Sequence, residues 1–295
     1  MPELPEVETI ARLLRPDLVG RMVLAANVRW PRTIAFPSVR TFKREITGQV
    51  IHAVTRRAKF LHLQLSTAEL LIHLRMSGDL ELKQPGARAS KHDRLILLLA
   101  PAPSRAASQA PAPPASAPRD SIVCLVFNDT RKFGRVWLTK DVRDVTGRLG
   151  PEPLERGFTS RRLYLALHAR RRQLKPLLLD QTFIAGLGNI YTDEALHLAR
   201  LHPLARADSL TERQAVRLHA AIRQTLREGI RRNGASIDWV YRGGDLQNHF
   251  RVYDRAGKPC PVCGTKIKRS LWGSGAPISA RTSRECDTWK SASLP

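Results

Sequence analysis

The chain opens with Met1-Pro2-Glu3-Leu4-Pro5-Glu6-Val7-Glu8, where two prolines and three acids begin a segment with helical spacing. Proline is favoured in the first turn of a helix, and acidic side chains there complement the helix dipole. One face is apolar, as the helical period requires, and its members are Val7, Ile10, Leu13 and Leu14. The stretch therefore predicts an amphipathic helix over residues 1–20 that leads the fold.

The second residue of this stretch is also a candidate nucleophile. A small second residue favours removal of Met1, which would leave Pro2 as a terminal secondary amine. Such an amine has a pKa of about 8; the helix dipole lowers it, while Glu3 and Glu6 oppose that effect. The neutral amine is nucleophilic. From this stretch alone, a purely structural role for Pro2 and Pro5 at the helix start is the simpler interpretation.

The chain of 295 residues is strongly basic, with 49 Lys and Arg against 26 Asp and Glu and a formal net charge of +23. A charge this large repels itself, so it is typical of proteins that bind a polyanion. The hydrophobic fraction of 42% is that of a globular protein, and the length suffices for two domains. The charge indicates nucleic acid, but a ribosomal or architectural protein would share it.

Four cysteines are present, and three of them lie near the C-terminus. This distribution favours a metal site in a reducing compartment over a disulfide framework. No apolar run has the length of a transmembrane helix, and no signal peptide precedes the acidic start. We therefore expect a soluble, cytoplasmic protein without a membrane partner.

Residues 1–148 are predicted to form one β domain behind the first helix. Several segments alternate or are continuously apolar, as strands are. These segments are residues 50–54, 60–65, 70–74, 94–99, 122–127 and 134–137. Between them, residues 100–118 are dominated by Ala, Pro and Ser. That composition predicts a disordered insertion at the surface of the domain.

The pattern becomes helical afterwards, and residues 149–240 are predicted to form a second domain. Ser209-Leu210-Thr211-Glu212 has the form of a capping box before a long helix that Asn233-Gly234 ends. The apolar face of this helix comprises Ala215, Leu218, Ile222, Leu226 and Ile230. With a helix over Ile190–Arg200 it suggests a helix-turn-helix-like pair. Residues 241–295 are predicted to form short strands and turns that carry the cysteines.

Six motifs follow one another along the chain. They are the opening stretch, Arg56-Arg57-Ala58-Lys59-Phe60-Leu61, His73-Leu74-Arg75-Met76-Ser77-Gly78, Asn128-Asp129-Thr130-Arg131-Lys132-Phe133-Gly134, residues 174–180 with 186–191, and residues 250–253 with 260–264. In this order they resemble the formamidopyrimidine/endonuclease VIII family of DNA repair enzymes, in particular its formamidopyrimidine-DNA glycosylases. The resemblance implies an α+β fold of two domains: an N-terminal β-sandwich with a leading helix, and a helical helix–two-turn–helix domain followed by a zinc-finger-like β-hairpin.

The resemblance implies a bifunctional DNA glycosylase and abasic-site (AP) lyase of base-excision repair. In this family the terminal proline, here Pro2, attacks the sugar of a flipped-out nucleotide, and the resulting Schiff base drives β,δ-elimination. Glu3 is the implied general acid/base, Glu6 a supporting acid, and Lys59 a helper of proton transfer near a phosphate. Without this context, Lys59 would be interpreted as a solvated lysine at a strand end.

A flipped-out base leaves a gap that the family fills from two probing loops, which here carry Met76, Arg131 and Phe133. Thioether and aromatic side chains suit insertion between base steps, and Arg131 is implied to bond cytosine opposite the lesion. A lone Met or Phe is usually a core residue, but both lie in polar turns here. Because endonuclease VIII-like enzymes usually lack this set, the implied substrates are oxidised purines, namely 8-oxoguanine and formamidopyrimidines.

Further DNA contacts are implied for Asn189, Lys175, His73 and His92, and Arg281 stands at about the spacing of the family's phosphate-gripping arginine. Glycines before Asn189 let the backbone approach a phosphate at a helix N-terminus, although a tight turn between helices also explains them. The implied partner is double-stranded DNA with oxidised bases or abasic sites, bound by a monomer. The implied location is the cytoplasm of a bacterial-type cell, in association with the nucleoid.

The C-terminus departs from the family pattern. The family holds zinc with two Cys-x2-Cys pairs, whereas Cys260, Cys263 and Cys286 are followed by Trp289 where a fourth cysteine is expected. Two alternatives stay open: Zn2+ held by three thiolates with water or Asp287, and a degenerate hairpin held by packing without metal. We predict zinc as the cofactor and no organic cofactor.

Two other functions stay open at this point. One is an endonuclease VIII-like glycosylase for oxidised pyrimidines. The other is a damaged-DNA-binding protein with little or no turnover. The set of Pro2, Glu3 and Lys59 argues against the binding protein, whereas the altered C-terminus keeps it open.

Overall fold

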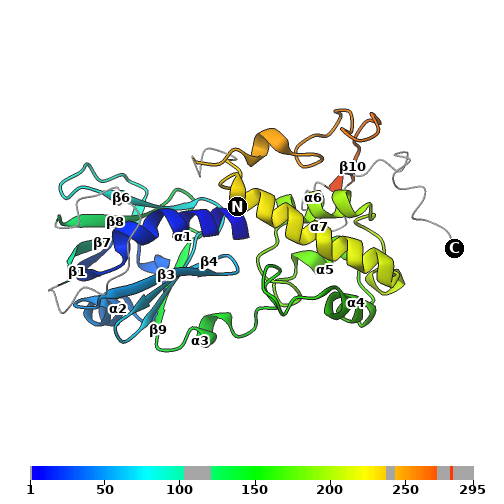
Figure 1. The fold of residues 1–295 in the computed structure, drawn as a ribbon. Helices are drawn as coiled ribbons and strands as arrows, with labels where there is room; N and C mark the ends of the chain where they lie inside the picture. The colour runs from blue at the N-terminus through cyan, green and yellow to red at the C-terminus, as the bar shows by residue number, and fades with distance from the viewer. Residues whose placement is uncertain (1, 103–120, 237–242, 271–279, 282–295) are drawn as a thin grey trace. The chain divides into compact units, whose positions relative to one another are not determined.

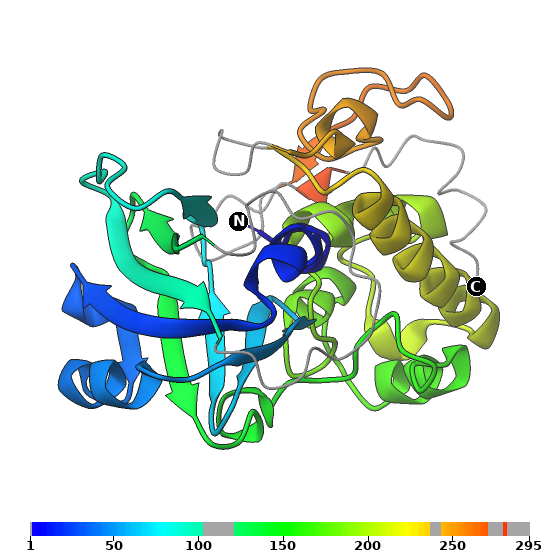
Figure 2. The ribbon, with the colours of Figure 1, turned by 60° about the vertical axis from the view of Figure 1, so that its left-hand side comes forward.

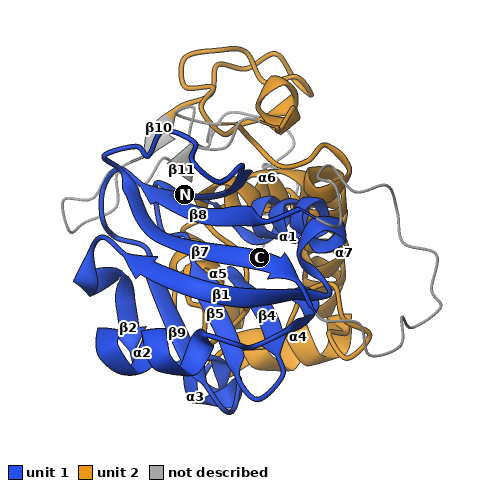
Figure 3. Ribbon diagram, turned by 90° about the vertical axis from the view of Figure 1, so that its left-hand side faces the viewer, with its two compact units in different colours: residues 1–148, 237–242 blue, residues 149–236, 243–295 orange. Residues whose placement is uncertain are grey.

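The computed structural model describes residues 2–102, 121–236, 243–270 and 280–281. The chain divides into two compact units, residues 1–148 with 237–242 and residues 149–236 with 243–295 (Figure 3). Of the insertion that we expected over residues 100–118, only residues 100–102 lie within the described ranges. None of the helices in these ranges is long and apolar enough to cross a membrane.

Helix α1 (Leu4–Leu18) opens the first unit, where the sequence predicts a helix. Glu3 is its N-cap residue, and the Glu3 N–H donates to Oε2 of Glu6 at 2.8 Å. Of the predicted apolar face, Val7, Ile10 and Leu14 are buried and Leu13 is exposed. The helix is followed by Gly20 with φ +85°, a left-handed conformation that glycine adopts without strain.

Two β-sheets form most of the first unit, which confirms the predicted sandwich (Figure 1 and Figure 2). One sheet has the order β1-β7-β8-β6 and the other β2-β9-β5-β4-β3. The first consists of β1 (Arg21–Val28), β7 (Asp93–Pro101), β8 (Val123–Asp129) and β6 (Gly78–Lys83). The second consists of β2 (Ile34–Phe36), β9 (Arg135–Thr139), β5 (Glu69–His73), β4 (Phe60–Leu65) and β3 (Ile51–Arg57).

Strand pairs in both sheets are antiparallel, except that β2 runs parallel to β9. One apolar core contains side chains from both sheets and from α1, among them Val7, Leu61 and Leu97. The unit ends with the short helix α3 (Arg143–Thr146). The core thus fixes α1 beside the strands that precede and follow Lys59.

Helix α2 (Val39–Ile46) is a second helix of the first unit, which we expected to contain only strands behind its first helix. The Ser38 side chain caps it and accepts from the Thr41 N–H at 3.3 Å. Phe42 and Ile46, four residues apart, are its buried side chains. A helix of 8 residues offers only two buried positions, too few for the helical period to stand out in the sequence.

The second unit is helical, as predicted. Its helices are α4 (Ser160–His168), α5 (Leu174–Leu179), α6 (Asn189–Ala199) and α7 (Glu212–Arg231). On α7, Ala215, Leu218, Ile222 and Leu226 are buried as expected. The capping box that we predicted for Ser209 and Glu212 is wrong, because it forms two residues later, between Thr211 and Gln214. The Thr211 N–H donates to the Gln214 side chain at 2.8 Å, and the Gln214 N–H donates to the Thr211 side chain at 3.2 Å.

The C-terminal segment is anchored to α6 by one carboxylate. Glu194 accepts the backbone N–H groups of Arg251, Val252 and Tyr253 at 2.9–3.0 Å. Beyond this anchor, β10 (Arg269–Ser270) pairs antiparallel with β11 (Ala280–Arg281). The segment therefore includes a two-stranded element in the region where a hairpin was expected.

Candidate active site and DNA-contacting residues

The predicted catalytic residues of the first unit lie together at the start of α1. Pro2 is buried immediately before the N-cap residue Glu3. Glu3 and Glu6 are 2% exposed and Lys59 is 5% exposed. Both carboxylates act on Lys59 as opposing charges. Met1, whose removal would free the Pro2 amine, lies outside the described residues.

Lys59 lies in the two-residue turn between β3 and β4, directly before the strand that the sequence predicts from residue 60. Arg57 pairs with Phe60 across this turn, and Ala58 adopts φ +53°. That conformation costs a residue with a Cβ about 1–2 kcal/mol. Burial lowers the pKa of Lys59, and Glu3 and Glu6 oppose the effect. The amine therefore releases its proton more readily than an exposed lysine does.

Arg56 braces this turn, a role that the sequence analysis missed. Its Nη1 donates to the Ala58 carbonyl at 3.0 Å, and its Nε donates to Oε2 of Glu8 at 3.1 Å. Because Glu8 belongs to α1, one guanidinium joins the helix that carries Glu3 to the turn that carries Lys59. The only signal in the sequence was that Arg56 belongs to the motif around Lys59.

His73 ends β5 and joins the same group of residues. Its ring lies edge-on to Phe60 with centroids 4.7 Å apart. The Arg75 N–H donates to Nδ1 at 3.0 Å, so in the neutral ring the proton is on Nε2. Burial, followed by the charges of Arg75 and Lys59, lowers the pKa of His73 to about 3. A neutral ring with an N–H donor can bond a phosphate oxygen at neutral pH.

The three residues predicted to fill the gap in the duplex lie at the surface, as expected. Met76 is 43% exposed and Phe133 is 47% exposed. The guanidinium of Arg131 lies 4.9 Å from the ring centroid of Phe133. Left-handed backbone at Arg75 and Lys132 shapes the two turns.

Asp129 ties the two probing loops together, which the sequence analysis also missed. Its carboxylate accepts from the Ser77 hydroxyl, from the Arg131 N–H at 3.2 Å and from the Gly134 N–H at 2.7 Å. The Asp129 N–H donates to the carbonyl of His92 at 2.9 Å. Ser77 follows Met76, so one buried carboxylate positions both loops, and His92 lies beside it.

In the second unit, Asn189 is the exposed first residue of α6. Gln181 holds the turn before it. The Gln181 amide donates to the Leu187 carbonyl at 2.7 Å and accepts the Gly186 N–H at 2.9 Å. Gly186 has φ +95°, which explains the need for glycine. The helix N-terminus and the Asn189 side chain are thus available to an anion.

Lys175 differs from the prediction, since it is 1% exposed inside α5. Its Nζ lies 2.6 Å from Oδ1 of Asp193 on α6. This geometry gives Lys175 a role in joining two helices. A direct contact with DNA phosphate, which we predicted, would require this buried pair to separate.

The C-terminal site residues lie only partly within the described ranges. The turn at Cys260 closes with hydrogen bonds from the Gly264 N–H to the Cys260 carbonyl at 2.9 Å and from the Cys260 N–H to the Thr265 carbonyl at 2.8 Å. Cys260 has a free thiol, and Cys263 is disulfide-bonded. Cys286 and the side chain of Arg281 lie outside what the structure describes. Among the residues that it does describe, no group of three potential ligands could hold a metal.

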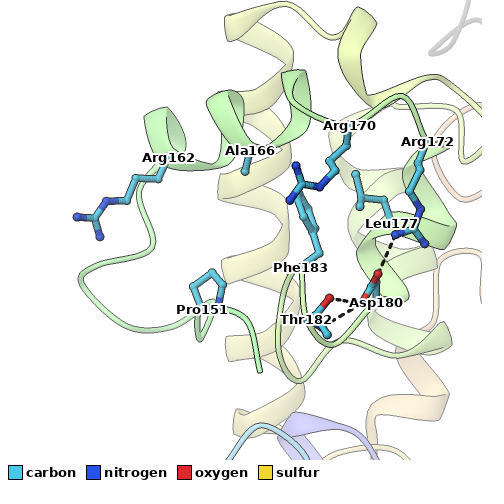
Figure 4. A pocket seen from close by; sticks show the side chains of 9 residues that line it. All are labelled: Pro151, Arg162, Ala166, Arg170, Arg172, Leu177, Asp180, Thr182 and Phe183. Atoms are coloured by element: carbon cyan, nitrogen blue, oxygen red, sulfur yellow. Dashed lines mark hydrogen bonds and ion pairs between the residues drawn. The ribbon is translucent and has the colours of Figure 1, made fainter. Parts of the chain in front are cut away.

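Two hollows in the second unit contain none of the predicted site residues. The smaller, of about 300 Å³, is bordered by Arg162, Arg170 and Arg172 (Figure 4). There Asp180 accepts from Thr182 and Arg172, which lowers the pKa of Asp180 to about 2. The larger, of about 660 Å³, lies along α7.

Comparison with known proteins covers nearly the whole chain. The model of the formamidopyrimidine-DNA glycosylase N-terminal domain matches residues 1–136, and that of the H2TH domain of the same enzyme matches residues 149–240. The formamidopyrimidine-DNA glycosylase of Chloroflexus aurantiacus is 44% identical over 98% of this chain and 97% of the relative. That of Pelotomaculum thermopropionicum is 41% identical over 98% of each chain.

Solved structures agree with the sequence comparison. Lactococcus lactis Fpg (MutM) in complex with DNA containing N7-benzyl-Fapy-dG gives a TM-score of 0.84 at 31% identity, over 97% of this chain and 99% of that chain. The L. lactis enzyme bound to DNA with an AP site gives a TM-score of 0.82 at 30% identity, over 97% and 99%. The resemblance that the motifs indicated is confirmed, and the chain belongs to the formamidopyrimidine-DNA glycosylase family.

Proposed function

We propose that this chain removes oxidised purines from duplex DNA and then cleaves the strand at the abasic site. The observation that carries the proposal is the buried group of Pro2, Glu3 and Lys59 at the start of α1, in a chain of this family. Structures of the related enzyme contain Fapy-dG or an abasic site, which supports oxidised purines as the substrate class. The cytoplasmic, nucleoid-associated location stays a prediction.

The first chemical step forms a bond between the Pro2 nitrogen and C1′ of the flipped-out nucleotide. The glycosidic bond breaks, and the base leaves with its electron pair and takes up a proton. Glu3, as a general acid, protonates O4′ while the C1′–O4′ bond breaks. The bonded Pro2 nitrogen loses its N–H proton, and the lone pair that this restores forms a double bond to C1′ as the C1′–O4′ bond breaks. Because proline is a secondary amine, the product is a permanently cationic iminium.

The iminium drives strand cleavage because it withdraws electrons from C2′. Loss of a C2′ proton forms a C=C bond as the C3′–O bond breaks, and the 3′ phosphate leaves with that electron pair. A second elimination releases the 5′ phosphate, and water frees the amine. The lowered pKa of Lys59 supports a role for this amine in accepting and returning protons.

Recognition of the lesion is proposed for the two probing loops and for α6. Exposure of Met76 and Phe133 supports their insertion into the gap, with Arg131 bonded to the opposite base. Asn189 at the N-terminus of α6 supports a phosphate contact. The brace from Asp129 to both loops supports insertion of the loops as one element.

Trapping with borohydride tests the proposal, since it reduces an iminium to a stable amine. We expect a covalent protein–DNA adduct with a duplex that contains 8-oxoguanine opposite cytosine. The adduct should be strongly reduced in Pro2→Gly, whose primary amine gives an imine without a permanent charge. Pro5→Gly is the matched control, because it changes the same helical turn and leaves the nucleophile in place.

Borohydride trapping, together with a comparison of two lesions, separates the competing functions. A folded wild-type protein that binds the duplex and forms no adduct would refute the enzyme in favour of a damaged-DNA-binding protein. Faster excision of thymine glycol than of 8-oxoguanine would assign the chain to the pyrimidine-specific branch. Equal loss of adduct in Pro2→Gly and Pro5→Gly would leave Pro2 with a structural role only.

For the C-terminus, the proposed metal is zinc held by Cys260, Cys263 and Cys286, with water or Asp287 completing the set. The described turn supports half of such a site, since two cysteines three residues apart are a common ligand pair. Both would have to be thiolates, so the metal requires the reduced form of Cys263. Zinc would supply a structural cross-link. Metal analysis of protein purified under reducing conditions should find one zinc per chain, lost in Cys260→Ser, and its absence in active protein would favour a hairpin held by packing.

A further inference from the structure

Helix α7, the long yellow helix of Figure 1, carries a row of arginines along the larger hollow. Arg223, Arg227 and Arg231 line this groove of about 660 Å³ at every fourth position. Four residues advance an α-helix by about one turn. The three guanidinium groups therefore follow one another along the same side of the helix.

The acid in this groove is already engaged. Glu228 accepts from Nη2 of Arg251 at 3.0 Å and lies 3.5 Å from Nε of Arg232. Arg227 and Arg231 are both exposed. Because Glu228 is the acidic residue of the groove lining, no other carboxylate of that lining neutralises their charges.

The row is held rigidly at one end. Nη1 of Arg223 donates to the carbonyls of Pro153 and Glu155 at 2.7 and 3.0 Å. Burial, followed by the charge of Arg227, lowers the pKa of Arg223, so the two cations repel each other. Like charges four residues apart destabilise a helix. A row of this kind gains stability when a polyanion binds to it.

The row points away from the helix that carries Asn189. A Cβ at Gly229 would lie 2.5 Å from the ring of Tyr191 on α6, so this position of α7 faces α6. Arg227 and Arg231 are two residues to either side of Gly229. Each is therefore about 200° from Gly229 around the axis of α7, nearly opposite the side that faces α6. The groove is therefore a surface of the second unit separate from the Asn189 turn.

We propose that Arg223, Arg227 and Arg231 form a second DNA-binding surface, which binds the phosphate backbone of duplex DNA without regard to sequence or damage. Arginine suits this task because its planar fork bonds phosphate oxygens in pairs. The proposal rests on the proposed function in that DNA is the partner. The surface raises affinity for undamaged DNA and leaves the chemistry of excision unchanged.

Two double variants, each of which removes two positive charges from α7, test this surface. Arg227→Gln with Arg231→Gln removes the exposed part of the row and keeps Arg223, which also bonds the backbone. Arg213→Gln with Arg217→Gln removes two exposed arginines of the same helix that do not line the groove. For each variant we would measure affinity for an undamaged duplex as a function of salt, and single-turnover excision of 8-oxoguanine at saturating protein.

Loss of two phosphate contacts should reduce the slope of log affinity against log salt by about 1.8 in the groove variant. The control should change it by less than half as much, and both should excise at the wild-type rate once bound. Equal slopes in the two variants, or a groove variant with the wild-type slope, would overturn the proposal. A wild type that binds DNA but never excises would refute the proposed function. The salt slopes of the two variants could still be compared, because they are measured from binding alone.

Discussion

Among the residues that the structure describes, each unit buries one lysine beside carboxylates, but the two lysines are held differently. In the first unit, Lys59 lies in a turn, and Glu3 and Glu6 act on it as opposing charges. In the second unit, Lys175 lies inside a helix, and its Nζ is 2.6 Å from Oδ1 of Asp193. The exposed fractions of Lys59 and Lys175 are 5% and 1%, so burial alone does not distinguish them.

The difference shows how a buried lysine is assigned to chemistry or to architecture. A close pair such as Lys175 with Asp193 fixes the distance between two helices, and separating it is costly. Lys59 instead has a lowered pKa and more than one carboxylate in its field. Groups with perturbed pKa values of this kind cluster at functional sites. The comparison predicts that substitutions in the two groups affect different measurements.

The largest effect is expected for Glu3→Gln. Because the amide cannot protonate the sugar oxygen, single-turnover excision of 8-oxoguanine should fall by about 10²–10⁴-fold. The melting temperature should change little, since the Glu3 N–H can still bond Glu6. Glu45→Gln, an exposed acid on α2, is the control. A variant that keeps the wild-type rate would remove Glu3 from the chemistry.

Lys175→Met should act on stability instead. It removes the charge that lies 2.6 Å from Oδ1 of Asp193 and leaves that carboxylate buried, so the free energy of unfolding should fall by about 3–5 kcal/mol. Denaturant titration measures this fall, and Lys175→Met combined with Asp193→Leu should recover much of it. If Lys175→Met unfolds like the wild type but binds DNA weakly, the predicted phosphate contact is right and the architectural role is wrong.

Arg56→Gln tests whether Lys59 depends on its brace. Loss of the bonds to Ala58 and Glu8 should displace the Lys59 turn and lower kcat by about 10²-fold, with KM nearly unchanged. Arg15→Gln is the matched control, because Nε of Arg15 also joins α1 to β3, through the Val54 carbonyl at 2.8 Å, and does not touch the turn. Equal losses in both variants would indicate a general effect of helix packing.

The smallest effect concerns acid stability. The folded pKa of His73 is about 3, below the unfolded value of about 6.5. Between these values the unfolded state binds more protons, so stability falls as pH falls from about 6.5 towards 3. At pH 5 this amounts to roughly 2 kcal/mol. His73→Gln should therefore flatten the pH dependence of the unfolding free energy.

The second unit supplies the counterpart to this measurement. Burial lowers the pKa of His197 on α6 to about 4. Stability again falls as the pH falls, but over a narrower pH range than for His73. His197→Gln should relieve acid sensitivity in the second unit, as His73→Gln does in the first. Stability of His73→Gln that falls between pH 7 and pH 5 as steeply as that of the wild type would contradict the low pKa.

Local sequence patterns predicted the parts of the site that depend on neighbouring residues. The first helix follows from the spacing of its apolar residues, and the exposure of Met76 and Phe133 follows from the polar turns that contain them. The same reasoning failed where local signals compete. Thr211 caps α7 in place of Ser209, because both residues precede the helix and only the backbone geometry decides which of them caps it.

The braces around the site could not be predicted, because their partners are distant in sequence. Arg56 and Glu8 are 48 residues apart, and Ser77 and Asp129 are 52 residues apart. A single sequence contains no record of such pairings. For the same reason the motif suggested a DNA contact for Lys175 and gave no sign of its partner on α6.

The carboxylate of Asp129 has a consequence for how this enzyme can be altered. Because it bonds both the segment with Ser77 and the turn from Arg131 to Gly134, the two segments form one exchangeable module. Consider a chimera that takes only one of these segments from a relative with a different lesion preference. The transferred segment would then have to bond a carboxylate whose position suits the original segment. Transfer of specificity therefore requires residues 73–78 and 128–134 to be exchanged together.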